Sequence, residues 1–584
     1  MSAFFLVPYN RVNLLNSAQE SFKRRGFING KRFRLSCGEL LLFSKVMLPE
    51  TNNFYQIQSA SIYCVGTLIY KGESFKSSLQ LLLKDLVEGS LKFEALQGNF
   101  VVLYDNGVRV NLLTDQTGMY KLFSNSDRDF ITTSFMAAAS CLQEIRFNHI
   151  AVREQLLYGF VSAPDTLVEG IQDVSRGFNT SWLDNNIFYP PRTLTQAASS
   201  KQKSIEMQVD GISTYMSNAA KLLQEFGGEC GISGGCDSRL IYASVHAKCG
   251  KLNSAHSHCT SKIHQSELGI AKQICELNKT PLQIIPTTYL PDCEGTLIDE
   301  TLKENVYYYD ARNAENIGAM SLTHTRDYKN ATANKNGLTF SGIGGEIYRD
   351  FYFTKSSWYT PKQWLETRIF ANGVKQMLAK RDYDSTVEYI ISKISKSIGH
   401  ELNRKVNPID TKDYFSKYRI PNALSNVVHA NNQMSFYLAP FTESTLIACA
   451  RPNYKMQDHL GGYEGLIIEQ FDKRASLIKT SKGDYNLHNI PTRLKYKWML
   501  QSWYPYFIWK ARLKLTGKNQ NSSIAYKKML EKSRYFKQAV DCFKETFPEI
   551  SIIPIEEGLV PLNSFVFTVC AIYELHQLNN NMNL

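Results

Sequence analysis

Alternating apolar and polar residues mark the first part of the chain. The alternation covers residues 26–46 and 54–70, and the strand pattern continues over 100–104 and 108–114. A period of two residues sends successive side chains to opposite faces of a sheet, so each strand can line a core. The pattern predicts a layered, β-rich N-terminal domain over residues 1–192, which ends near Pro190-Pro191.

A polar stretch at 193–203, interpreted as a linker, separates this domain from a different pattern. Helix-like 204–226 leads to short strands at 230–232, 252–256 and 282–285, with helical segments between them. Such alternation implies a parallel sheet whose ligand lies beyond the carboxyl ends of its strands. After residue 351 the chain becomes mainly helical, and 564–578 is expected to be a packed helix. We therefore expect a second α/β domain over residues 204–584.

Composition limits the class of protein. The chain has 584 residues, of which 43% are hydrophobic, as in a soluble globular protein with two or more domains. No apolar run approaches the roughly 20 residues of a membrane-spanning helix, and the apolar opening lacks a charged leader. Twelve cysteines without regular pairing favour a reducing compartment. We expect a cytoplasmic protein that makes no membrane contact. The net charge of +12 favours anionic ligands or reflects solubility alone.

The segment 233–238 (Ser-Gly-Gly-Cys-Asp-Ser) carries the most specific chemistry of the chain. Gly234 and Gly235 allow the backbone to approach a phosphate chain, and Ser233 and Ser238 add hydroxyl donors. The helix that follows directs its free N–H groups at the anion. Asp237 supplies a hard oxygen ligand for the Mg²⁺ that accompanies ATP. We interpret the segment as a pyrophosphate-binding turn of a kind other than the Walker motif, whose Gly-Lys-Ser/Thr is absent.

These residues resemble the ATP pyrophosphatase domain of the asparagine synthetase family, which carries Ser-Gly-Gly-x-Asp-Ser. A predicted strand at 338–340 leads into residues 341–346, which are similar to the family's second glycine-rich turn. Residues 440–443 are similar to its Pro-Phe-Leu-Asp segment. Residues 96–100, 114–118 and 121–123 are similar to the end of its glutaminase-type domain. The resemblance implies an α/β fold with an Ntn-hydrolase-like αββα domain first. An ATP pyrophosphatase (PP-loop) domain with a largely helical C-terminal part follows it.

The resemblance also implies the roles of individual residues. Mg²⁺ would lie between Asp237 and Glu346, and ATP would contact Ile232, Ser233, Gly234, Gly235, Asp237, Ser238, Ser257, Ser341 and Gly342. A lysine of the family meets the developing charge, and Lys479 and Lys482 are the candidates here. Arg239 is a third candidate, because a cation in the first turn of a helix opposes the dipole unless an anion is near. A solvated surface arginine is the alternative.

Two departures from the family narrow the predicted activity. A class II glutaminase needs an N-terminal cysteine, and this chain begins Met1-Ser2-Ala3. The N-terminal domain is therefore expected to be degenerate, with a nucleophilic role for Ser2 left open. Phe436 and Leu438 stand where the family has an acid and an arginine, so free aspartate would lack partners for its charges. β-Lactam synthetases and lasso-peptide cyclases are relatives that use an amine already present on the substrate.

The predicted function is an ATP-dependent ligase that adenylates a carboxylate and transfers it to ammonia or a substrate amine. The carboxylate can belong to a small molecule, a sugar-linked compound or a peptide. An intramolecular cyclase, an RNA-modifying ATP pyrophosphatase and a non-catalytic scaffold are the alternatives. A glutaminase-like first half argues against the RNA enzyme, so we do not expect a nucleic-acid partner.

The stretch 495–514 is rich in aromatic and basic residues. It is similar in composition to a platform for nucleic acid or peptide. A buried amphipathic helix pair is the prediction we favour for it.

Overall fold

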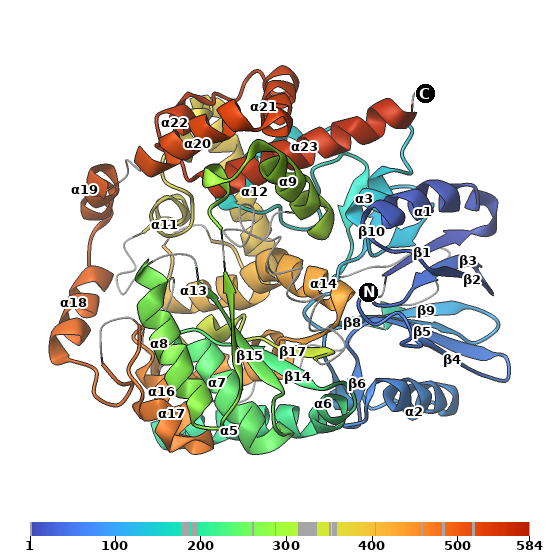
Figure 1. Cartoon of the computed structure of the whole chain (residues 1–584), viewed down its shortest axis with the longest axis horizontal. Helices are drawn as coiled ribbons and strands as arrows, with labels where there is room; N and C mark the ends of the chain where they lie inside the picture. Colours follow the sequence, from blue (N-terminus) through green and yellow to red (C-terminus); the bar gives the residue numbers. More distant parts are fainter. Residues whose placement is uncertain are drawn as a thin grey trace.

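The computed structural model describes most of the chain: residues 3–176, 186–187, 197–259, 262–286, 288–312, 336–349, 352, 359–402, 405–456, 459–481, 485–516 and 520–582. In Figure 1 the antiparallel sheets lie at the right, the parallel sheet at the lower centre and the last helices along the top. The predicted domain boundary near Pro190-Pro191 lies outside the described residues.

Two sheets of mainly antiparallel strands form the N-terminal half. The first has the order β12-β10-β11-β1-β3-β2, and the second β13-β9-β8-β5-β4. The strands are β1 (Ala3–Pro8), β2 (Gly30–Leu35), β3 (Gly38–Phe43), β4 (Phe54–Ile57), β5 (Ala60–Gly66), β8 (Phe100–Asp105), β9 (Val110–Thr114), β10 (Phe123–Asn125), β11 (Ile131–Thr132), β12 (Ile171–Asp173) and β13 (Asn186–Ile187), with β6 (Ile69–Tyr70) and β7 (Leu96–Gln97) as a separate pair.

Alternate residues of these strands serve two cores. Phe4, Leu6, Leu40, Tyr63 and Val101 belong to a cluster that the two sheets share. Their neighbours along the strands belong to a second cluster, which also includes residues of α1 (Leu14–Arg24) and α2 (Phe75–Glu88). The period of two thus gives each sheet one face for the other sheet and one for a helix. This layering agrees with the predicted β-rich domain, and Figure 1 shows α1 and α2 on opposite sides of it.

A five-stranded parallel sheet organises the second half. Its order is β16-β15-β14-β17-β18, built from β14 (Gly228–Gly231), β15 (Ser254–Cys259), β16 (Leu282–Pro286), β17 (Leu338–Phe340) and β18 (Phe436–Leu438). In chain order, β15 and β16 lie on one side of β14, and β17 and β18 lie on its other side. The strand order therefore reverses between β14 and β17, where open parallel sheets bind ligands. The predicted parallel sheet is confirmed, and β18 is an addition to it.

Helices surround this sheet and make up the rest of the second half. They include α5 (Lys201–Asn218), α6 (Ala220–Phe226), α7 (Cys236–Ser244), α8 (Lys262–Glu276), α9 (Gly295–Tyr308), α11 (Pro361–Arg368), α12 (Lys380–Ile398), α13 (Pro408–Asp413), α14 (Ser425–Met434), α15 (Ser444–Ala450), α16 (Gly462–Phe471), α17 (Lys473–Leu477), α18 (Thr492–Ser502), α19 (Tyr506–Thr516), α20 (Gln520–Lys532), α21 (Arg534–Thr546), α22 (Ile553–Glu556) and α23 (Leu562–Met582). Among the described residues, no helix combines the length and apolar character needed to cross a membrane.

Helix α14 joins the two halves, and all ten of its residues are buried. The side chain of Gln433 accepts a hydrogen bond from Arg25 at 2.7 Å, and the Asn432 carbonyl accepts one from Lys45 at 2.7 Å. Nearby, Glu443 stands at the N-cap of α15 but makes no side-chain capping hydrogen bond with that helix. Its carboxylate instead accepts the N–H of Gly98 at 2.8 Å. One hydrophobic cluster continues from Ala3 to Leu578.

Candidate active site

The turn after β14 is tied to the first turn of α7. The Ser238 hydroxyl accepts the N–H of Ser233 at 3.1 Å, and the Ser233 hydroxyl accepts the N–H of Gly235 at 3.2 Å. The two hydroxyl oxygens are 3.1 Å apart. Two hydroxyls and the first N–H groups of α7 are therefore gathered at one end of the sheet, the arrangement that favours a bound anion.

Gly234 allows a later segment to reach this turn. Its carbonyl accepts the N–H of Ser481 at 3.3 Å, and a Cβ on Gly234 would lie 2.8 Å from that of Ser481. Ser481 follows Lys479, whose side chain is exposed. The predicted cation Lys479 is thus on a segment that contacts the Ser-Gly-Gly turn. The other candidate, Lys482, lies outside the described residues.

The second glycine-rich turn, 341–345, follows β17 and touches the first. A Cβ on Gly342 would lie 2.7 Å from the backbone nitrogen of Ser238. A Cβ on Gly345 would lie 2.2 Å from Oδ1 of Asp237. Ser341 donates its N–H to the carbonyl of Leu438 at 2.9 Å, which fixes the start of the turn on β18. Both contacts with the first turn exclude a side chain, so these glycines bring the two turns together.

The predicted metal ligands lie close enough to affect each other. Burial raises the pKa of Glu346, and the negative charge of Asp237 raises it further, against the opposing effect of Arg349. Oδ1 of Asp237 is buried and has no hydrogen-bond partner within the part of the chain that the structure describes. Hard carboxylate oxygens and an unsatisfied buried acceptor are what a divalent cation can use. Asp237 and Glu346 thus offer two carboxylates to the predicted Mg²⁺; no group of three or more histidine, cysteine or acidic side chains placed to hold a metal ion occurs among the described residues.

Arg349 is a member of the site that the motifs did not indicate. Its guanidinium forms an ion pair with Oδ2 of Asp237, and its Nε lies 3.5 Å from Oε2 of Glu464, a fully buried residue of α16. Burial alone would lower the pKa of Arg349, but the charges of Asp237 and Glu464 outweigh it and raise that pKa. Arg349 therefore neutralises Asp237 and competes with a metal for its carboxylate.

Arg239 has a different place from the one predicted. It is fully buried rather than solvated, and its guanidinium donates to the carbonyls of Ile478 at 2.7 Å and Lys479 at 2.8 Å. Burial lowers its pKa. The expectation that it faces an anion is corrected, because carbonyl oxygens of the protein meet its charge. Arg239 instead holds the segment that carries Lys479.

Two predicted nucleotide contacts are buried in the sheet. Ile232 is 3% exposed and donates its N–H to the carbonyl of His256 at 2.8 Å, and Ser257 on β15 is 5% exposed. Ser233, Asp237, Ser238, Ser341 and Glu346 lie on or next to the two glycine-rich turns at the edge of the sheet, and contact of Ile232 and Ser257 with a nucleotide stays a prediction. Phe436 and Leu438 are fully buried in β18.

Comparison with known proteins adds no family to this description. No protein-family model matches the chain, and no curated protein matches it. The resemblance to the asparagine synthetase family remains a prediction that rests on the motifs and on the geometry described above.

Proposed function

We propose that the chain is an ATP-dependent ligase that forms an amide bond by adenylating a carboxylate. The observation that carries the proposal is the meeting of the two glycine-rich turns at the point where the strand order reverses. There Asp237 and Glu346 interact electrostatically, and the Ser233 and Ser238 hydroxyls lie 3.1 Å apart. Parallel sheets bind nucleotides at this position, and the amino end of a helix favours phosphate.

The reaction proceeds in two steps. An oxygen of the substrate carboxylate attacks the α-phosphorus of ATP, the bond from that phosphorus to the bridging oxygen breaks, and pyrophosphate leaves. An amine then attacks the acyl carbon of the adenylate, AMP leaves and the nitrogen loses a proton. Positioning and charge stabilisation supply most of the catalysis in phosphoryl transfer. Ammonia or a substrate amine can complete the reaction.

The chain's own residues have separable roles in this proposal. The Ser233 and Ser238 hydroxyls and the N–H groups at the start of α7 would hold the pyrophosphate, with Gly234 and Gly235 leaving room for it. Asp237 and Glu346 would hold Mg²⁺, which when bound neutralises charge on the triphosphate. Lys479 is the described cation nearest in sequence to Ser481, which contacts the turn. Arg239 fixes the backbone of Lys479 and is a positioning residue.

Exchange of labelled pyrophosphate into ATP tests the proposal. Purified protein with Mg²⁺ and a set of candidate carboxylates should catalyse exchange, and Asp237→Asn should lower the rate at least about 100-fold, as expected when a key electrostatic group is removed. Asp210→Asn, at an exposed aspartate of α5, is the matched control and should retain the rate. Equal rates for the two variants, or no detectable ATP binding by the wild type, would contradict the proposed function.

A further inference from the structure

Helices α18 and α19, here called the α18–α19 region, expose an apolar stripe. Tyr496 is 57%, Leu500 58%, Trp503 53% and Phe507 69% exposed. The first three are spaced i, i+4 and i+7, which places them on one face of α18; Trp503 retains helical backbone angles at its C-cap. Large apolar side chains are exposed singly on most proteins, and a cluster marks an interaction site. The prediction of a buried helix pair is therefore wrong for this face.

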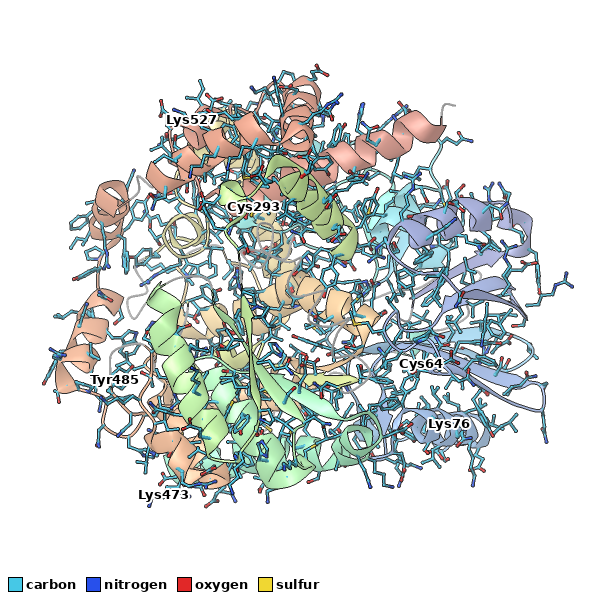
Figure 2. The ribbon with its side chains drawn as sticks, viewed as in Figure 1. Cys64, Lys76, Cys293, Lys473, Tyr485 and Lys527 are labelled. Atoms are coloured by element: carbon cyan, nitrogen blue, oxygen red, sulfur yellow. The ribbon has the colours of Figure 1, made fainter. Side chains whose placement is uncertain are left out.

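The inward side of the α18–α19 region is already anchored to the rest of the protein. Tyr506 donates its hydroxyl to Glu366 at 2.5 Å, and the Trp509 ring lies 4.2 Å from the guanidinium of Arg368. On α18, the Trp498 ring lies parallel to that of His459. The exposed stripe is thus a second, outward face. Figure 1 shows both helices at the left edge of the molecule, and Figure 2 shows Tyr485, at the start of the segment that leads into them, on the same side.

Positive charge surrounds this stripe. Residues 485–530 contain no aspartate or glutamate and carry nine lysines and arginines. Five of these cations lie on the α18–α19 region with exposed side chains: Arg493, Lys495, Lys497, Lys510 and Arg512. The tract therefore attracts anions over a wide area.

A cavity lies between α19 and α11. It has a volume of about 500 Å³ and a mixed lining, in which Leu157, Phe370 and Leu559 stand beside charged and polar side chains such as Glu366 and Lys375. Lys510 and Tyr506 of α19 form part of its wall. An amphipathic molecule that meets Lys510 with an anionic group can thus find apolar surface beside it.

We propose that the α18–α19 region binds the surface of an anionic phospholipid membrane. Aromatic and aliphatic side chains flanked by lysine and arginine are typical of helices that lie in the membrane interface. Single-stranded nucleic acid would use the aromatic rings and cations, but Leu500 and Ile508 offer it no ring to stack on. The expectation of no membrane contact is thus limited to spanning helices. The proposal is independent of the proposed ligase activity.

Vesicle cosedimentation tests the proposal. The full chain should bind vesicles of phosphatidylcholine with roughly 30 mol% phosphatidylglycerol at least about 10-fold more tightly than phosphatidylcholine alone, and about 0.5 M salt should weaken this binding. The double variant Trp503→Ser, Phe507→Ser should lose at least about 10-fold in vesicle affinity. The matched control, Val108→Ser with Ile553→Ser, removes equally exposed apolar side chains elsewhere and should bind like the wild type.

Two outcomes would overturn the proposal. Wild-type protein that does not bind the anionic vesicles would refute it directly, without reference to any variant. Tighter binding to a labelled single-stranded RNA than to vesicles, lost in the Trp503→Ser, Phe507→Ser variant, would assign the surface to nucleic acid. Circular dichroism of each variant shows whether an observed loss reflects unfolding, and pyrophosphate exchange is expected to be the same in all three proteins.

Discussion

Two buried arginines organise the candidate site in different ways. Arg349 places a positive charge against Asp237 and Glu464, so the site already holds a cation that balances its acids. Arg239 donates hydrogen bonds to backbone carbonyls and thereby fixes the position of the segment that carries Lys479. One arginine therefore sets the charge of the site, and the other sets its shape.

Substitution of Arg239 tests the second role. Arg239→Met leaves several buried carbonyls without a charged donor, so we expect the free energy of unfolding to fall by about 3 kcal/mol. Urea denaturation measures this change. Arg474→Met is the control, because Arg474 lies on the same segment with an exposed side chain paired to Asp472, and we expect little change. A similar loss of stability in both variants would contradict the structural role of Arg239.

For individual residues, the sequence predicted those that belong to the glycine-rich motifs but not the residues that contact them from other segments. Ser233, Asp237 and Ser238 could be predicted because glycines and a helix start fix their backbone. Arg349 and Glu464 could not, because their roles depend on a contact between segments more than a hundred residues apart. Arg239 was misjudged because a helix-dipole argument considers only its own helix, whereas its partners lie on the 475–479 segment.

At the scale of elements, contact between the two glycine-rich turns creates the site. Each turn follows a predicted strand, so the placement of both at the same sheet edge could be deduced from the alternation of strands and helices. The short strand β18 could not be deduced, since three apolar residues show no periodicity and only pairing with β17 defines them. The exposed face of α18 was missed because large aromatic residues are buried on average.

Gly342→Ala tests the contact between the turns. The added Cβ would lie 2.7 Å from the backbone nitrogen of Ser238, so the turns must separate, and we expect a loss of about 1–3 kcal/mol of stability together with weaker ATP binding. Gly269→Ala in α8 is the control, because nothing lies within 4 Å of its added Cβ. Alanine in a helix should stabilise by about 1 kcal/mol. Thermal unfolding and nucleotide titration compare the stability and ATP affinity of the two variants. Unchanged ATP binding in Gly342→Ala would show that ATP binding does not require the close contact between the two turns.

At the scale of the whole molecule, buried polar groups hold the halves together. His429 of α14 accepts the N–H of Lys121 at 3.1 Å through Nδ1 and lies edge-on to the ring of Tyr120. Burial, aided by the positive charges of Arg312 and Arg25, lowers the pKa of His429 well below its usual value. The interface is therefore built around a neutral imidazole.

This predicts a loss of stability in acid. Above the ordinary histidine pKa of about 6.5 neither the folded nor the unfolded chain protonates His429. Below that value only the unfolded chain binds the proton, so stability falls by up to about 1.4 kcal/mol per pH unit. His429→Asn should unfold more easily at about pH 7.5 but lose less stability between about pH 7 and pH 5. Urea denaturation of both proteins at several pH values measures this dependence. If the free energy of unfolding changed equally with pH in both proteins, the prediction would be contradicted.

The burial of α14 also constrains how this protein can change over evolutionary time. The side chains of Gln433 and Asn432 on one half are matched by those of Arg25 and Thr67 on the other, so a replacement on either side requires a compensating one across the seam. A gene that lost its first two hundred codons would encode a product with those polar groups stranded in an uncovered apolar patch. The N-terminal half is thus retained together with the second half, whether or not it performs any chemistry of its own.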